Sequence, residues 1–108
     1  MPMNETYTDQ EPPRAEVDAL QGPTVIEFGT AWCGHCSAAQ RHIASAFSGH
    51  AELRHLKIED GPGRPLGRSF RVKLWPTLIF MKDGEEVERL VRPKDAEPIR
   101  KAMGKIDP

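Results

Sequence analysis

Apolar positions fall into short runs along the chain, and several runs have the length and spacing of β-strands. The first is nearly continuous, which predicts a central strand covered on both faces. The last two flank the dipeptide Asp83-Gly84, a strong signal for a hairpin with a tight turn. The predicted strands cover residues 24–28, 53–58, 77–81 and 87–91.

Between these runs, apolar residues recur at the spacing of amphipathic helices. The clearest case places Ala39 and Ile43 on one stripe, with Arg41 outside it. The predicted helices cover residues 14–21, 33–47, 64–70 and 94–103, and Gly104 is the expected end of the last one. This order of elements predicts an α/β fold with a central mixed sheet of four or five strands, flanked by helices on both faces.

The beginning of the chain has a different composition from the rest. Residues 1–13 are polar and contain three prolines, which predicts a flexible N-terminal arm before a single domain over residues 14–108. Tyr7, which lies between two threonines, could add a short edge strand to the sheet.

Charge and hydropathy narrow the class of protein further. The 15 basic and 16 acidic residues give a net charge of -1, so nothing global calls for nucleic acid or an anionic membrane as a partner. The apolar runs are too short for a transmembrane helix. The first 21 residues lack the basic and apolar segments of a signal peptide, so we expect the protein in a reducing cytoplasm. We also expect a monomer.

The two cysteines of the chain, Cys33 and Cys36, stand two residues apart where the first strand leads into a helix. The first turn of a helix presents free N–H groups and a partial positive charge, which favour the thiolate form of Cys33. Cys36 follows one turn later, within reach of Cys33. The spacing therefore suits a dithiol that cycles with a disulfide.

A metal site is the other reading of such a pair. Zinc would need two more ligands, for which His42 and His50 are the nearest candidates. The sequence contains no second pair of cysteines, and a strand leading into a helix is the context of redox pairs. We therefore expect neither a bound metal nor an organic cofactor.

Three stretches together resemble the thioredoxin family over about residues 24 to 104: Val25-Ile26-Glu27-Phe28, Trp32-Cys33-Gly34-His35-Cys36 and Trp75-Pro76-Thr77-Leu78. The resemblance implies a thioredoxin-like fold and a thiol–disulfide oxidoreductase acting on protein disulfides. In that family the first cysteine attacks the substrate and the second resolves the mixed disulfide. A thioredoxin reductase or a low-molecular-weight thiol would then supply the electrons.

The resemblance also implies roles for the neighbours of the dithiol. Glu27 matches the family's buried acid, usually Asp, and would take and return the proton of Cys36, for which a raised pKa is suitable. Lys57 is its expected partner. The resemblance implies substrate binding through Trp32, Trp75 and Pro76, with a cis bond before the proline.

The residues between the cysteines, and several departures from the family pattern, should affect the reduction potential of the dithiol and its choice of substrate. Gly34 and His35 are expected to tune the potential, because Cys-Gly-His-Cys is the form found in protein disulfide isomerases and a histidine there can stabilise the reduced thiolate. Gly29 stands where the family has an aromatic residue. Arg92 stands where the family has a glycine and is expected to take part in substrate binding. With Arg71 and Lys73 it could surround the substrate groove with positive charge.

These observations favour a protein disulfide reductase and leave two alternatives. His35 raises the possibility of disulfide oxidase or isomerase activity. An aromatic patch formed by Trp32 and Trp75 could instead belong to a binding module whose thiols are incidental.

Overall fold

Four strands form one mixed sheet in the computed structural model, which describes residues 3–50 and 52–108. The strand order is β2-β1-β3-β4. Strand β1 runs parallel to β2 and antiparallel to β3, and β3 is antiparallel to β4. The strands are β1 (Pro23–Gly29), β2 (Arg54–Glu59), β3 (Thr77–Lys82) and β4 (Glu85–Val91). The predicted mixed sheet is confirmed, with the hairpin turn at Asp83-Gly84 between β3 and β4.

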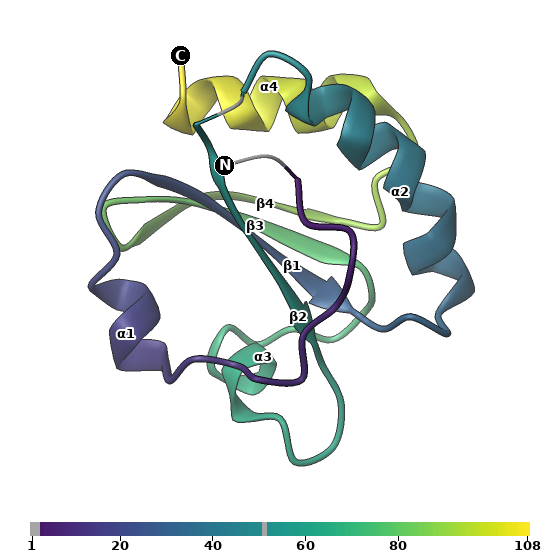
Figure 1. Ribbon diagram of the computed structural model, residues 1–108, viewed down its shortest axis with the longest axis vertical. Coiled ribbons are helices and arrows are strands. Elements are labelled where there is room, and N and C mark those ends of the chain that lie inside the picture. The colour runs from purple at the N-terminus through teal and green to yellow at the C-terminus, as the bar shows by residue number, and fades with distance from the viewer. Residues whose placement is uncertain (1–2, 51) are drawn as a thin grey trace.

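Helices cover both faces of this sheet, as predicted. Figure 1 shows α2 and α4 on one side and α1 and α3 on the other. The helices are α1 (Arg14–Asp18), α2 (Gly34–Phe47), α3 (Pro65–Ser69) and α4 (Ala96–Ile106). Within the residues that the structure describes, no helix has the length and apolar character needed to cross a membrane.

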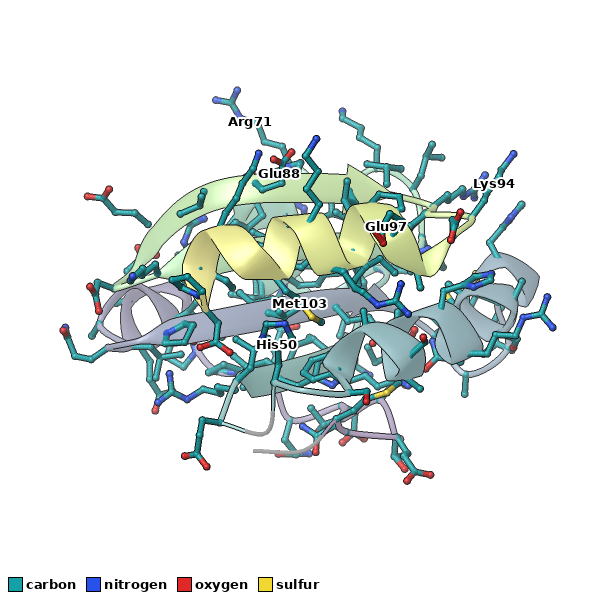
Figure 2. The ribbon with its side chains drawn as sticks, turned by 90° about the horizontal axis from the view of Figure 1, so that it is seen from above. His50, Arg71, Glu88, Lys94, Glu97 and Met103 are labelled. Atoms are coloured by element: carbon teal, nitrogen blue, oxygen red, sulfur yellow. The ribbon has the colours of Figure 1, made fainter. Side chains whose placement is uncertain are left out.

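Each face of the sheet has its own hydrophobic core because successive side chains of a strand point to opposite faces. In β1, Val25 packs with residues of α2 and α4, whereas Ile26 and Phe28 pack with residues of α1 and α3. On α4, the fully buried Met103 joins the first core, and Figure 2 shows it between that helix and the sheet. Burial on both faces explains the continuous apolar run of β1.

Two predicted helix ends were wrong. Helix α4 continues through Gly104 to Ile106, because Ile106 packs into the core beside Met103 and the Asp107 N–H donates to the Met103 carbonyl at 2.8 Å. Burial of an apolar side chain outweighs the roughly 1 kcal/mol cost of a glycine inside a helix. Helix α1 ends at Asp18, three residues before its predicted end.

Residues 4–8 of the segment predicted as a flexible arm lie along the free edge of β2, and the chain then continues past α3 to α1 (Figure 1). Residues 1 and 2 of that prediction lie outside the described residues. Thr8 forms a parallel bridge with Ile58: its N–H donates to the Lys57 carbonyl, and its carbonyl accepts from the Glu59 N–H, both at 2.9 Å. This pairing carries Tyr7 over the sheet.

Candidate active site

The dithiol lies where β1 leads into α2, as predicted. Cys33 is the N-cap of α2, and its sulfur accepts a hydrogen bond from the Cys36 backbone N–H at 3.2 Å. Both thiols are free. The exposed fraction is 9% for Cys33 and 1% for Cys36, so only the first sulfur is within reach of a large partner. An N–H directed at the Cys33 sulfur can support the negative charge of an attacking sulfur at this position.

The environment of Cys36 favours its protonated form. Burial raises the pKa of Cys36 to about 11, and the hydrogen bond and charge of Cys33 act in the same direction. The Thr30 backbone and the Tyr7 side chain lower the pKa of Cys36 by smaller amounts through hydrogen bonds. Cys36 therefore remains a thiol at neutral pH, while Cys33 is placed to act as the nucleophile.

An aromatic surface lies beside the dithiol. Trp32 is 77% exposed, and its ring meets that of Trp75 edge to face at 5.7 Å between centroids. The peptide bond between Trp75 and Pro76 is cis. Large exposed aromatic side chains with one polar atom are typical of surfaces that bind other proteins.

Two residues hold Trp75 in this position. The carboxylate of Asp60 accepts a hydrogen bond from the Trp75 indole N–H at 2.9 Å. A Cβ atom on Gly67 would stand 2.3 Å from Asp60 Oδ1, so only glycine leaves room for that carboxylate. Arg92, predicted to bind substrate, donates from Nε to the Trp75 carbonyl at 2.8 Å. Arg92 also adopts the φ of 51° that suits the glycine expected there.

Behind the dithiol, Glu27 is fully buried in β1 and is surrounded by donors. Its Oε2 accepts from the Tyr7 hydroxyl at 2.6 Å and from Gln40 Nε2 at 2.9 Å, and Lys57 Nζ lies 3.9 Å away. Its Oε1 lies 3.0 Å from His55 Nε2. The Asn4 backbone N–H can only donate to His55 Nδ1, which places the ring proton on Nε2, facing Glu27.

The expected raised pKa of Glu27 was wrong. Burial alone would raise the pKa, but the His55 hydrogen bond, the Lys57 charge and the hydrogen bonds from Tyr7 and Gln40 outweigh it, and the pKa is lowered. Glu27 is therefore ionised at neutral pH. Lys57, its expected partner, also donates to Gln40 Oε1 and lies over the Tyr7 ring.

Basic side chains lie on two sides of the dithiol. His35 is exposed and lines one shallow pocket with Arg41, Arg92 and Lys94. Arg71 and Lys73, with Arg64 and Arg68, line a second pocket that reaches Trp75. Figure 2 shows Arg71 and Lys94 extending outward from the molecule. Gly34, predicted to tune the potential, is the first residue of α2 and leaves open space where a Cβ would stand.

The candidate zinc ligands do not come together. His50 Nδ1 lies 2.7 Å from the Asp107 carboxylate, at the far end of α2, while His42 lines the pocket beside His35. Over residues 3–50 and 52–108, no group of three His, Cys, Asp or Glu side chains could hold a metal ion.

Sequence reasoning missed the contacts of four site residues: Tyr7, Gln40, His55 and Asp60. Each lies on a different segment from the residue it contacts, so local spacing gives no sign of the pairing. For Tyr7, the sequence does contain one indication of a tertiary contact, since it is the only aromatic residue in the polar segment of residues 1–13. An aromatic side chain there is more easily explained by packing than by solvation.

A mixed sheet covered by helices on both faces, a reduced Cys-x-x-Cys at a helix start and a cis-proline at the start of a strand define the class of dithiol oxidoreductases with a thioredoxin fold. The family profile described as Thioredoxin matches residues 6–105. The chain therefore belongs to the thioredoxin family and is a thiol–disulfide oxidoreductase.

Individual relatives agree with this assignment. The structure of reduced thioredoxin 2 from Pseudomonas aeruginosa PAO1 is 55% identical, with a TM-score of 0.86 and 96% of each chain covered. A thioredoxin of Chlamydia trachomatis is 39% identical over 88 residues, which cover 78% of this chain and 82% of that protein. A thioredoxin of Staphylococcus saprophyticus is 33% identical over 89 residues, covering 76% and 84%.

Proposed function

We propose that this protein reduces disulfides in protein substrates, with Cys33 as the nucleophile and Cys36 as the resolving thiol. This proposal rests on the different environments of the two sulfurs. Cys33 accepts the Cys36 N–H at the start of α2 beside an exposed aromatic surface, whereas Cys36 is buried and has a raised pKa. One thiol is thus ready to attack, and the other is held back for the second step.

The reaction proceeds by two exchanges. The Cys33 thiolate attacks one sulfur of the substrate disulfide, and the other substrate sulfur leaves as a thiolate. Cys36 loses its proton and attacks the Cys33 sulfur, which forms the Cys33–Cys36 disulfide and releases the second substrate sulfur as a thiolate. Two electrons pass to the substrate, and a thioredoxin reductase or a low-molecular-weight thiol restores the dithiol.

The aromatic surface is the proposed substrate site. Trp32 and Trp75 supply apolar area next to Cys33, and an extended substrate segment would pair with the backbone around Pro76. Arg92 supports this site from behind, because it binds the Trp75 carbonyl. A reducing compartment such as the cytoplasm suits this direction of electron flow.

Glu27 is the proposed acid–base group of the second step. Its cluster of donors keeps it ionised, so it can accept a proton only transiently. The structure places the Tyr7 hydroxyl against it, on the side of Cys36.

The test is a pair of single-cysteine variants assayed with a protein disulfide substrate. Cys33→Ser should abolish reduction and form no adduct. Cys36→Ser should also lose turnover but accumulate a covalent mixed disulfide that mass spectrometry detects. Equal adduct formation by both variants would contradict the assigned roles, and full activity of the double variant in a functional assay would favour a binding module.

Oxidase or isomerase activity is the second candidate, because His35 is exposed at the start of α2, between the two cysteines. The equilibrium potential of the pair separates the candidates. A value near that of thioredoxin, about −270 mV, supports a reductase, and a value near about −180 mV supports an isomerase.

A further inference from the structure

Tyr7 reaches the dithiol from a part of the chain that is remote in sequence. The pairing of Thr8 with β2 lays residues 4–8 across the sheet edge, and the Tyr7 ring lies beneath Lys57 Nζ, 4.7 Å from it. The Tyr7 hydroxyl donates to Glu27 Oε2 at 2.6 Å. The backbone pairing and this hydrogen bond fix the ring in one place.

Gly29 shows how close this hydroxyl is to the resolving sulfur. A Cβ atom on Gly29 would stand 2.5 Å from Cys36 Sγ and 2.7 Å from the Tyr7 hydroxyl. Both distances are shorter than any tolerable contact, so the sulfur and the hydroxyl occupy the space in front of a residue that has no side chain. The two groups therefore lie close together across this space, and the Tyr7 side chain lowers the pKa of Cys36. The absence of an aromatic residue at position 29 thus makes room for the aromatic ring of Tyr7.

The hydroxyl carries one proton and faces two acceptors, Glu27 and the Cys36 sulfur. The Glu27 carboxylate keeps other hydrogen-bond partners if the Tyr7 hydroxyl turns away, since Gln40 donates to the same oxygen at 2.9 Å and His55 lies against the other oxygen. When Cys36 loses its proton, rotation about the C–O bond of Tyr7 can direct the hydroxyl proton to the new thiolate.

We propose that Tyr7 is a catalytic residue of the resolving step, whose hydroxyl stabilises the Cys36 thiolate as it attacks the Cys33 sulfur. The thiol proton of Cys36 passes transiently to Glu27, the acid–base group of the proposed function, and then to solvent in the adjoining cavity of about 240 Å³, which Tyr7 and Cys36 line. The S–S bond to the substrate breaks as the Cys33–Cys36 bond forms, and the substrate leaves as a thiolate. This inference deepens the proposed function and rests on it.

The protonation states of the surroundings support this role. Burial, the Glu27 charge and hydrogen bonds to Glu27 and Cys36 raise the pKa of Tyr7, so the hydroxyl remains a donor at every pH of interest. The titratable groups that face the pair are Cys33 and Glu27 on β1 and the loop after it, His55 and Lys57 on β2, and Glu5 and Glu59 at the cavity wall.

Tyr7→Phe tests the proposal, because it removes only the hydroxyl and keeps the ring under Lys57. Reaction of the reduced protein with an aromatic disulfide reagent releases one coloured thiolate when Cys33 attacks and a second when Cys36 resolves. In Tyr7→Phe the first release should keep its rate, and the second should slow about 10-fold or more, since a hydrogen bond to a charged group is lost. Its pH profile should also move to higher pH.

Asn4→Ala is the matched control. It removes the side-chain hydrogen bond from Asn4 to the His55 carbonyl, which tethers the same segment without touching Cys36. Both releases should keep the parent rates. Equal slowing in the two variants would mean that Tyr7 only anchors the segment, and an unchanged second release in Tyr7→Phe would overturn the proposal.

A second measurement needs no turnover. In a Cys33→Ser background, the thiolate absorbance of Cys36 should appear at higher pH when Tyr7→Phe is added, and coincident titrations would contradict the proposal. Failure of the parent protein to release either thiolate would contradict the proposed function itself. If both thiolate releases have the same rates in the parent protein and in Tyr7→Phe, only the proposed role of Tyr7 is contradicted.

Discussion

The two sides of the dithiol differ in almost every physical respect. In front of Cys33, Trp32 stands exposed against Trp75, and few contacts restrain its ring. Behind Cys36, the buried Glu27 accepts hydrogen bonds from three separate segments, and its neighbours bind one another. One side is open and apolar, and the other is closed and polar.

This difference separates recognition from proton chemistry. A flat exposed surface can accept many partners, because apolar contact makes few demands on geometry. A buried carboxylate is stable only when its donors are fixed, so the rear of the site is rigid. The substrate therefore meets Cys33 first, and Cys36 acts only after the mixed disulfide has formed.

The largest expected effect tests the closed side. Glu27→Gln should lower the free energy of unfolding at pH 7 by about 3 kcal/mol, because Lys57 loses its buried counter-charge and the new amide opposes the surrounding donors. The pKa of Glu27 is lowered in the folded protein from its ordinary value of 4.5. Its charge therefore stabilises the fold above that pH, and this contribution is lost as the pH falls through the folded value.

The difference in the free energy of unfolding between the parent and Glu27→Gln should accordingly shrink as the pH falls from 7 to strongly acidic values. Urea unfolding at several pH values measures it. The exposed pair of Glu86 and Arg89 is present in both proteins and cancels in the difference. A gap that stays constant with pH would show that Glu27 is not held as a carboxylate.

On the open side, we expect a substitution to affect substrate binding strongly and the stability of the fold only slightly. Trp32→Ala should change the free energy of unfolding by less than about 1 kcal/mol, since the ring is mostly exposed. The KM for a protein disulfide should rise about 10-fold, because an exposed aromatic anchor is lost. The rate with a small disulfide should stay within a factor of two. A similar loss with both substrates would mean that Trp32 acts on the Cys33 thiol rather than on substrate binding.

The smallest effect concerns the basic residues that border the open side. Arg64, Arg68, Arg71 and Lys73 line the pocket that reaches Trp75. The rate with a disulfide peptide flanked by acidic residues should fall about 3-fold from low to physiological salt, because exposed charges are screened. A matched peptide with neutral flanks should show no change, and Lys73→Gln should weaken the dependence. If the rates with the two peptides depend equally on salt, these basic residues do not contribute to substrate specificity.

Local patterns predicted much of the fold and half of the site. The run of β1, the stripe of α2 and the Asp83-Gly84 hairpin were recognisable because each depends on residues close in sequence. Helix α4 extended beyond its predicted end because the buried Ile106 lies beyond Gly104, and a local stop signal is weaker than core packing. The predicted pKa of Glu27 failed for a similar reason, since its donors come from distant segments.

The sequence by itself determined the dithiol, its place at a helix start and the family, because motif and periodicity are properties of neighbouring residues. Only the tertiary structure decided which groups meet Cys36. Tyr7 and Cys36 are 29 positions apart, and they meet because the first residues pair with β2 and Gly29 leaves space between them. Such contacts depend on how strands and helices pack, and hydrogen bonding across that packing sets the protonation of the site.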